Sequence, residues 1–446
     1  MEYIPKTASE EKEMLEAIGV SSFEDLIEIP HEFRLNRPLN LPPPLSQMAL
    51  KREMLDRSRR NADTTRTLSF LGGGSYDHFI PSTVDHVISR SEFYTSYTPY
   101  QAELSQGLLQ TIYEYQTMIC QLTGMEVACA SVYDGASALA EGALMAMRVT
   151  KRNKVLISRT VHPHYRQVVK TYLSGLQGIR LKEIPFHEGR TSLEALADSM
   201  DDGVAAILIQ HPNFFGQLEE MEAITQLIHS KGGLLVMAVD PISLGVLKTP
   251  GEYQADIAVG EGQPMGNAVS YGGPYVGFFA TRREMIRQMP GRVVGATTDE
   301  KGRPGFCLTL QTREQHIRRE RATSNICTNQ TLNALASAVY LATLGREGLR
   351  EVALLCLAKS HTAYRKIKAI PGYSDPFGGP FFKEFVIHLS HPASRFLERS
   401  SSAGLFAGID LGAYYRELKD HLLICITEQH QTEEIDRLVH RFQAAK

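Results

Sequence analysis

The sequence predicts an α/β fold with a mostly parallel sheet, and three observations support this prediction. Seven short apolar segments lie between residues 126 and 281. Helical patterns separate most of them, and such alternation is typical of a parallel sheet that is covered on both faces. At least two of the segments end in an acidic or glycine-rich loop, which is where ligands bind in sheets of this kind.

The first 60 residues are expected to form an N-terminal arm rather than a domain. Two short helical stretches precede LNRPLNLPPPLS, in which Pro38 and Pro42–Pro44 prevent regular structure, and a basic helical stretch follows over Lys51–Arg60. Arms of this kind commonly wrap a neighbouring subunit. A loosely packed leader is an equally good interpretation.

Residues 71–107 show no clear periodicity, although they contain three successive glycines, Gly72–Gly74, and many aromatic and hydroxyl side chains. A segment this long without regular structure inside a compact domain is usually functional. Tyr94, Tyr97 and Tyr100 are spaced by three residues around Pro99. Their hydroxyls are not needed for ordinary packing and suit the mouth of a pocket.

A helical pattern from Gln101 to about Leu122 leads into the sheet. The predicted strands are Glu126–Ser131, Lys154–Ser158, Arg180–Ile184, Val204–Gln210, Leu234–Asp240, Ala255–Gly260 and Val276–Thr281. The predicted helices are Gly135–Val149, Pro163–Leu176, Leu193–Met200 and Glu219–Ser230. Seven strands in this order fit the large domain of the aspartate-aminotransferase type, but periodicity alone indicates only α/β.

A polar stretch, 282–325, precedes a helical pattern from Gln330 to about Leu344. FFKEFVIHLS and LLICITEQ then read as strands, and TEEIDRLVHRFQ as a final amphipathic helix that opens at Thr432. We therefore expect an arm over 1–60, a large domain over 61–330 and a smaller α+β domain over 331–446.

Composition indicates a cytoplasmic globular protein. The net charge of −3 gives no electrostatic reason to expect nucleic acid or an anionic membrane as partner. No apolar run approaches the roughly 18 residues that span a bilayer, and the polar N-terminus resembles neither a signal nor a transit peptide. The six cysteines lack the paired spacing of a zinc or redox site. We therefore expect no metal site, and we expect the thiols to be reduced.

Asp240 stands at the end of an apolar strand, before a loop. A carboxylate at this position is what a pyridinium nitrogen needs, and pyridoxal phosphate (PLP) enzymes combine one with a Schiff-base lysine. The glycine-rich loop Gly260–Gly273 is where that lysine is expected. No lysine occurs between Lys248 and Lys301. Asp240 fits equally well as a cap for the following turn.

Other candidate residues follow neighbouring strands. Gly135, Ala136 and Ser137, after Asp134, begin a helix, where small residues leave N–H groups free to bind phosphate or simply allow tight packing. His162 and His164 are placed to stack on a cofactor ring or pair with an acid, or else are structural, and His211–Pro212–Asn213 has similar standing. Their positions at one end of one sheet strengthen them as a group.

The densest basic cluster lies within LTLQTREQHIRRERATSN and consists of Arg313, His316, Arg318, Arg319 and Arg321. Arginine forks suit recognition of a carboxylate or an acidic partner. A solvated helix face that pairs with Glu314 and Glu320 is the alternative. Nucleic acid is a poor third interpretation, because no aromatic interleaving accompanies the cluster.

Several strings resemble the N-terminal half of the glycine-decarboxylase P-protein family, which many bacteria make as a separate subunit 1, the alpha subunit. They are YTPYQAELSQG, YQTMICQLTGMEVACASVYDGASALAEG, SYGGPYVGFFATR, PGRVVGATTDEKG and LTLQTREQHIRRERATSNICTNQ. The resemblance covers about residues 60–345 and implies the PLP-dependent transferase fold type I of aspartate aminotransferase.

The resemblance also implies the chemistry of the glycine cleavage system. Glycine condenses with PLP and loses CO2, and the aminomethyl group passes to the lipoyl arm of the H-protein. The family places the Schiff-base lysine in the other subunit, or in the C-terminal half of single-chain forms. This chain would then be one subunit of an aminomethyl-transferring, decarboxylating glycine dehydrogenase, inactive alone and without a catalytic lysine.

The resemblance implies a heterotetramer of this chain with the lysine-bearing subunit 2, which holds PLP at a shared interface and works with lipoylated H-protein. An isolated chain is expected to be able to pair with itself. The residues expected to reach the substrate pocket at the interface are Ser96, Tyr97, Thr98, Tyr100 and Gln101, followed by Arg313 and His316. The residues expected to be relics of a cofactor pocket are Gly135, Ala136, Ser137, His162 and Asp240.

Two other functions remain open. One is a purely structural or regulatory pseudoenzyme that stabilises its partner, which the loop of hydroxyls and aromatics argues against. The other is a self-sufficient PLP enzyme, which would need a lysine after the strand Ala255–Gly260, whereas Lys248 precedes that strand.

Overall fold

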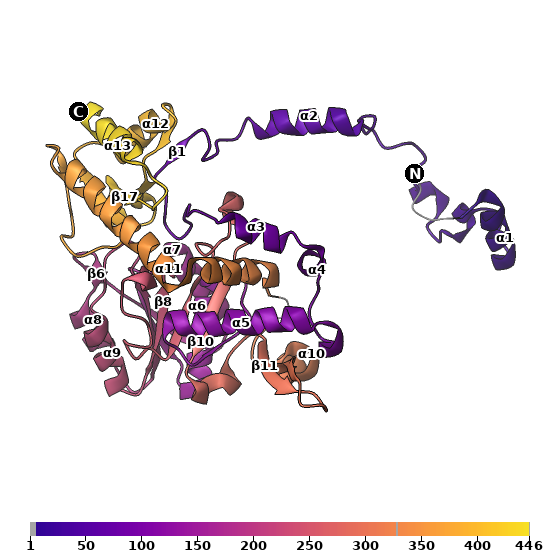
Figure 1. The fold of residues 1–446 in the computed structure, drawn as a ribbon, viewed down its shortest axis with the longest axis horizontal. Coiled ribbons are helices and arrows are strands. Elements are labelled where there is room, and N and C mark those ends of the chain that lie inside the picture. The colour runs from indigo at the N-terminus through magenta and orange to yellow at the C-terminus, as the bar shows by residue number, and fades with distance from the viewer. Residues whose placement is uncertain (1–5, 327–328, 446) are drawn as a thin grey trace. The chain divides into compact units, whose positions relative to one another are not determined.

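The computed structural model describes residues 6–326 and 329–445. Residues 1–5 of the predicted arm, Cys327 and Thr328 of the last quoted string, and Lys446 lie outside the described residues. The chain divides into two compact units, Met1–Ala62 and Asp63–Lys446 (Figure 1).

The first unit contains the predicted arm. Helix α1 (Ala8–Ile18) begins with a capping box, in which Thr7 and Glu10 bond each other's backbone N–H, and it ends at Gly19 in the left-handed conformation. Two 3-10 turns, η1 (Phe23–Leu26) and η2 (His31–Phe33), precede the proline-rich stretch, and α2 spans Gln47–Ser58. Neither α1 nor α2 has a buried side chain.

The second unit contains a seven-stranded sheet of order β2-β10-β9-β8-β7-β3-β4. Its strands are β2 (Val127–Ala128), β3 (Lys154–Ser158), β4 (Arg180–Ile184), β7 (Val204–His211), β8 (Leu234–Val239), β9 (Ile257–Glu261) and β10 (Gly277–Thr281). Strands β4, β3, β7, β8 and β9 are parallel, and β10 runs antiparallel to both β9 and β2. The predicted α/β class is confirmed.

The strand predicted over Glu126–Ser131 is shorter in the structure. Val127 and Ala128 form the ladder with β10, and Val132 rejoins β10 in an isolated bridge to Gly277. Between them the N–H of Ala130 donates to the carbonyl of Arg292 instead of to β10. The sheet therefore makes a backbone connection, at its β2 edge, to the segment that begins at Arg292.

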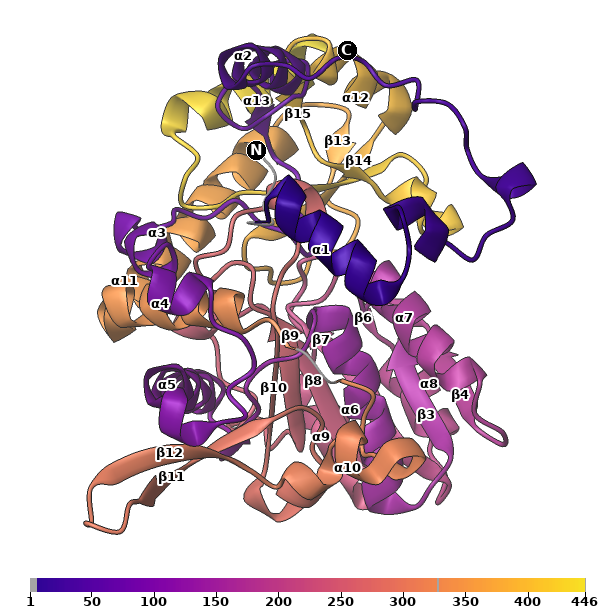
Figure 2. The same ribbon diagram turned by 90° about the vertical axis from the view of Figure 1, so that its right-hand side faces the viewer.

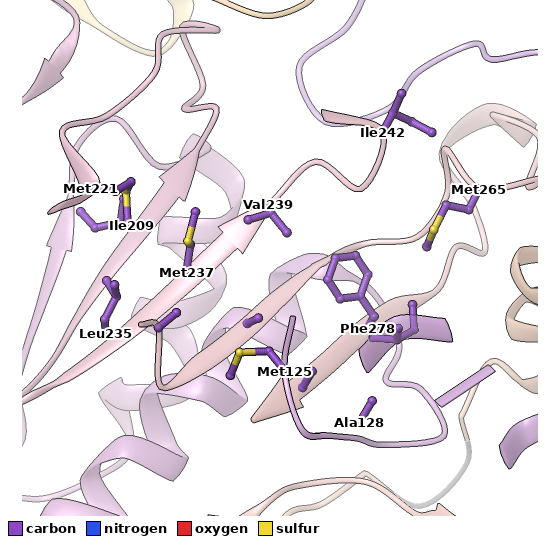
Figure 3. Packing of buried hydrophobic residues seen from close by; sticks show 14 of the residues in the cluster. Met125, Ala128, Ile209, Met221, Leu235, Met237, Val239, Ile242, Met265 and Phe278 are labelled. Carbon is purple, nitrogen blue, oxygen red and sulfur yellow. The ribbon is translucent and has the colours of Figure 1, made fainter. Parts of the chain in front are cut away.

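Helices cover both faces of the sheet, as Figure 2 shows. Along β8, Leu235, Met237 and Val239 join the core that contains residues of α5, α9 and α11, and Val236 and Ala238 join the core formed with α6 and α7. Figure 3 shows the first of these cores. The helices of the second unit are α3 (Ser82–Ile88), α4 (Ser91–Tyr94), α5 (Gln106–Thr123), α6 (Gly135–Thr150), α7 (Pro163–Ser174), α8 (Leu193–Ser199), α9 (Met221–Ser230), α10 (Gln315–Arg318), α11 (Thr331–Lys368), α12 (Ala393–Ser401) and α13 (Thr432–Ala444).

The stretch 282–325, expected to be polar connection, contains an antiparallel hairpin of β11 (Val293–Thr298) and β12 (Pro304–Thr309). Val294 and Leu308 pack against α5, while the distal half of the hairpin is largely exposed. The basic cluster beyond it does not form one long helix face. Helix α10 has only four residues, and Arg319 ends it with a positive φ of 50°.

A second sheet has the order β13-β14-β17-β16. Its strands are β13 (Tyr373–Ser374), β14 (Glu384–Leu389), β16 (Ile409–Asp410) and β17 (His421–Cys425). Shorter strand pairs are β1 (Leu68–Ser69) with β15 (Leu405–Phe406), and β5 (Phe186–His187) with β6 (Arg190–Thr191).

The second sheet lies in the range expected for a smaller α+β domain, and its strands β14 and β17 overlap the two segments predicted there, although β17 ends at Cys425. The helix predicted to end near Leu344 instead continues to Lys368 after a change of direction at Gly345, whose φ is 61°. Within the described ranges, we find no helix whose length and apolar character would suit a membrane span.

Candidate functional site

A crevice lies where β8 and β9 end, beside the N-terminus of α6. Asp240 follows β8, Glu261 ends β9, and Gly74 and Tyr76 cover them from the segment after β1. The free space is about 30 Å³, which is room for one or two water molecules. The strand-end crevice is therefore almost completely filled by the chain itself.

Lys383, the residue before β14, fills the position next to Asp240. Its Nζ lies 2.7 Å from Asp240 Oδ2, and the two side chains are 2% and 10% exposed. The ammonium also lies 3.5 Å from the centroid of the Tyr76 ring. Burial alone would lower the pKa of Lys383, but Asp240 together with the neighbouring Cys425 and Cys356 raises it. Asp240 thus holds a permanent cation of its own chain.

The contact continues from Lys383 to His78 and Glu428. Lys383 Nζ donates to His78 Nε2 at 3.0 Å, and His78 Nδ1 lies 2.6 Å from Glu428 Oε2. Burial and the charge of Lys383 lower the pKa of His78, which keeps the ring neutral. His78, Cys356 and Glu428 have potential metal-ligand atoms within 4.8 Å of one another, but the His78 nitrogens and Glu428 are already engaged and the neighbouring ammonium repels a cation.

Glu261 occupies the N-terminus of α6. Its Oε2 accepts the N–H of Gly135 at 3.0 Å, and its Oε1 accepts those of Gln263 and Val276, each at 3.1 Å. Burial raises the pKa of Glu261 to about 8, against the opposing effect of these N–H donors. The helix start that the sequence marked as a phosphate site is thus occupied by a carboxyl group of this chain.

The rest of that helix start is packed or capped. Ser137 forms a capping box with Asp134, and its N–H donates to Asp134 Oδ1 at 2.7 Å. Ala136 is buried, and a Cβ added at Gly135 would lie 2.3 Å from the Tyr165 hydroxyl. The tight-packing interpretation of Gly135 therefore has a physical basis.

His162 has no free ring face toward the crevice. Its Nε2 lies 2.6 Å from the carbonyl oxygen of Gly73, and one face stacks on Tyr165 with centroids 4.9 Å apart. A Cβ on Gly74 would come within 3.1 Å of the ring, so backbone lies where a cofactor ring would stack. Burial lowers the pKa of His162 to about 4.

These contacts show that the crevice does not fit PLP. The counter-ion Asp240 is paired with Lys383, the helix N–H of Gly135 is bound by Glu261, and His162 is covered. Glu384 closes the space further by accepting the N–H of Gly73 at 2.6 Å and the Tyr76 hydroxyl at 2.8 Å. Lys248 is no substitute Schiff-base lysine here, because it lies at the surface and pairs with Glu222 at 2.8 Å.

A second group of polar side chains gathers around Arg292, which the sequence interpretation did not single out. Arg292 Nη2 donates to the Tyr100 hydroxyl at 2.7 Å, and Nη1 lies 3.4 Å from Thr98 Oγ1. Its Nε donates to Glu314 Oε2 at 3.3 Å, and His316 Nδ1 lies 3.5 Å from the same oxygen. Three predicted site residues, Thr98, Tyr100 and His316, therefore meet around this pair.

The remaining predicted interface residues are placed differently. Ser96, Tyr97 and Gln101 are exposed on the tyrosine loop, residues 94–101, and Tyr97 is 77% exposed. Arg313 instead turns inward and donates to the carbonyl oxygens of Met289, Gly291 and Leu310. His211 is buried, and its Nδ1 accepts the N–H of Glu219 at 3.1 Å, which is a structural contact.

Arg292 and Lys383 were not singled out, although Arg292 lies within the quoted string PGRVVGATTDEKG and Lys383 within the predicted strand FFKEFVIHLS. Arg292 follows PG before an unpredicted strand, and Lys383 follows two phenylalanines at the start of a predicted one. One signal was present: each charged residue stands directly beside apolar residues, Arg292 before VV and Lys383 after FF, and charged residues are rarely buried unless paired.

Comparison with known proteins finds similar sequences and structures in one family. A family model described as glycine cleavage system P-protein matches residues 1–442. A protein of Carboxydothermus hydrogenoformans, described as probable glycine dehydrogenase (decarboxylating) subunit 1, is 54% identical over 440 residues, with 98% of each chain covered. A crystal structure of glycine decarboxylase (P-protein) in inhibitor-bound form superimposes with a TM-score of 0.92 at 43% identity and covers 100% of both chains.

The fold extends to more distant structures. A C-DES mutant with glycine covalently linked to its PLP cofactor gives a TM-score of 0.62 at 15% identity, over 86% of this chain and 99% of that one. At this identity the likeness concerns the fold alone. The chain has the PLP-dependent fold type I, as its resemblance to the P-protein family implied.

Proposed function

Because the chain belongs to the glycine cleavage system P-protein family, we propose that it is the subunit without the Schiff-base lysine. In this proposal the lysine-bearing subunit 2 holds PLP at a shared interface. The two subunits together decarboxylate glycine and transfer the aminomethyl group to the lipoyl arm of H-protein. The chain alone is inactive, and the assembly works as a heterotetramer in the cytoplasm.

One observation carries this proposal: the strand-end crevice of a PLP-type fold is filled by polar side chains of this chain. Lys383 lies where a ring cation would lie, 2.7 Å from Asp240, and the Glu261 carboxyl accepts the N–H of Gly135 at 3.0 Å, where a phosphate would bind. A subunit of this family whose own crevice is closed has a role in catalysis only at a site that it shares. The residues Gly135, Ala136, Ser137, His162 and Asp240 then serve the fold.

The groups that this chain offers to a shared site are those of the tyrosine loop and its neighbours. PLP supplies the electron sink that accepts the electron pair left by departing CO2. The exposed hydroxyls of Ser96, Tyr97 and Tyr100 orient the substrate by hydrogen bonds, and the tyrosine rings exclude water from the reacting carboxylate. The ring of His316 lies edge-on to that of Tyr100, with centroids 5.8 Å apart, and lines the same surface.

Two further features support the proposed location in the cytoplasm and the proposed pairing of an isolated chain. The described cysteines Cys120, Cys129, Cys307, Cys356 and Cys425 are all free thiols, as suits a reducing compartment. Because the chain has the same fold type as its proposed partner, an isolated chain has a surface suited to pairing with a second copy, as the true partner would.

A purely structural or regulatory subunit is the second candidate, and the filled crevice is the observation that favours it. Such a subunit would stabilise the lysine-bearing partner without contributing a group to its site. Substitutions in the tyrosine loop distinguish the two functions, because only the first requires those side chains for turnover.

The first experiment is to record the visible absorption of the purified chain with added PLP, before and after the lysine-bearing subunit is added. We expect no aldimine band from this chain alone. A band should appear with the partner, and CO2 release from glycine once lipoylated H-protein is present. A borohydride-reducible band from this chain alone would overturn the proposal and indicate an independent PLP enzyme.

A further inference from the structure

The tyrosine loop and the basic segment 311–321 are far apart in sequence. They are connected through the buried ion pair of Arg292 and Glu314, since Arg292 also donates to Tyr100. We propose that Arg292 and Glu314 are positioning residues, which hold Tyr100 and His316 in the arrangement that the shared site requires. This inference rests on the proposed function, since it assigns a role to two residues that act through the tyrosine loop.

The geometry at Arg292 fits a clamp. Its side chain is 4% exposed and that of Glu314 is 9% exposed. The guanidinium directs Nη2 to the Tyr100 hydroxyl, Nη1 to Thr98 Oγ1 and Nε to Glu314. It also lies 5.1 Å from the centroid of the Tyr100 ring. Only a planar fork of five donors reaches these partners at once, and a lysine ammonium in its place does not.

Glu314 extends the clamp to the basic segment. The Oε2 atom that accepts from Arg292 also lies 3.5 Å from His316 Nδ1. Tyr100 is 45% exposed and the His316 side chain 43% exposed. A buried pair thus supports two side chains that face outward, one from each segment.

The clamp is anchored to the sheet. The carbonyl of Arg292 accepts the N–H of Ala130 at 2.8 Å, directly beyond β2, and Val293 begins the hairpin that packs against α5. Tyr100 is therefore held through Arg292 to a rigid element, although it stands on an irregular loop. A side chain that is fixed in this way loses less conformational freedom when it engages a substrate.

The test uses the complex of this chain with the lysine-bearing subunit and lipoylated H-protein, with kcat and the KM for glycine measured by CO2 release. The variants are Arg292→Lys, Tyr100→Phe and the double variant. We expect each single variant to lower kcat by about tenfold or more, with a smaller change in KM, because misplacement by a fraction of an ångström already costs rate. In the Tyr100→Phe background, Arg292→Lys should add little.

Arg303→Gln is the matched control, because Arg303 lies on the same hairpin, is exposed and pairs with Asp299 at 2.7 Å. It should leave kcat unchanged. Thermal unfolding and the mass of the complex are measured for every variant. If Arg292→Lys fails to assemble, Glu314→Gln replaces it in the same cycle, since the amide has the size of the carboxylate but removes the charge that pairs with Arg292.

The outcomes distinguish failure of the positioning role from failure of the proposed function. If Tyr100→Phe leaves kcat unchanged, the tyrosine loop has no role in the site, and the proposed function loses its main support together with the clamp. If Tyr100→Phe lowers kcat but Arg292→Lys does not, only the clamp is overturned. Fully additive losses in the double variant would also overturn it, because Arg292 would then act independently of Tyr100.

Discussion

Lys383 Nζ lies 2.7 Å from Asp240 Oδ2, and this buried pair joins the two sheets of the second unit. Asp240 follows β8 of the seven-stranded sheet, and Lys383 precedes β14 of the four-stranded sheet. In a PLP-type crevice the carboxylate at this strand end serves a ring cation of the cofactor. Here a lysine of the same chain supplies the positive charge, so the crevice keeps its counter-ion without a ligand.

Removing one charge of this pair should destabilise the fold strongly. Lys383→Met leaves Asp240 with an uncompensated charge and takes a donor from His78, so we expect the free energy of unfolding to fall by about 3–5 kcal/mol. Adding Asp240→Asn to Lys383→Met should recover part of that loss, because no buried charge is then left unpaired. Urea denaturation followed by circular dichroism measures both effects.

Lys366→Met is the control for that experiment, because Lys366 pairs with Asp436 at 2.5 Å but both side chains are substantially exposed. Its midpoint of unfolding should hardly change, since exposed ion pairs contribute little. Equal midpoints for Lys383→Met and Lys366→Met would contradict the view that the crevice depends on its internal cation.

Glu261 should make stability depend on pH. Its pKa is raised from 4.5 to about 8, so between these values the folded state holds a proton that the unfolded state has released. The free energy of unfolding therefore falls as pH rises through this window, by up to about 1.4 kcal/mol per pH unit from this group. Glu261→Gln removes the titration, so the stability of the native chain relative to the variant should fall steadily from pH 5 to pH 8, by up to about 4 kcal/mol.

At pH 5 the Glu261→Gln variant should be the less stable protein. Both carboxyl oxygens accept backbone N–H groups, so an amide must turn its NH2 toward one of these donors, at a cost of about 1–3 kcal/mol. Unfolding curves at half-unit pH steps test both statements. A difference that stays constant over this range would show that Glu261 does not titrate within it.

The sequence predicted the parallel sheet well because its signal is local. The buried strand Lys154–Ser158 and the edge strand Arg180–Ile184 have the predicted bounds, and the predicted strands alternate with helices as β-α connections require. Errors came where pairing is decided by distant residues. The predicted strand is interrupted at Ala130, because Arg292, far along the chain, accepts the N–H of Ala130.

The candidate site was only partly predictable for the same reason. The spacing of the tyrosines identifies an exposed loop, and the structure shows Tyr97 and Tyr100 exposed. Nothing local connects Asp240 to Lys383 or Tyr100 to Arg292, because these contacts join residues 143 and 192 positions apart. Asp240 and Tyr100 could therefore be identified from the sequence, whereas their partners Lys383 and Arg292 could not.

Substitution of Arg313 distinguishes a structural role from the interface role that its sequence string predicted. Its guanidinium donates to the carbonyl oxygens of Met289, Gly291 and Leu310, although its motif favoured an interface role. Arg313→Met should therefore lower the free energy of unfolding by about 2 kcal/mol, since hydrogen bonds from charged groups are the stronger ones. Arg321→Met, at a side chain 81% exposed, should not. If instead both variants are equally stable and only Arg313→Met loses turnover, the interface role is correct.

Tyr97 is the sharpest test of the tyrosine loop itself. At 77% exposure, and with no hydrogen bond from its hydroxyl to any part of the chain that the structure describes, Tyr97 contributes little to folding. Tyr97→Phe should therefore preserve unfolding temperature and assembly with the lysine-bearing subunit, and should lower kcat for glycine decarboxylation several-fold, because a hydroxyl that orients the substrate is lost. Tyr414→Phe, at 39% exposure, is the control and should keep full activity. Unchanged turnover in Tyr97→Phe would remove this hydroxyl from the shared site and leave the structural-subunit alternative the stronger one.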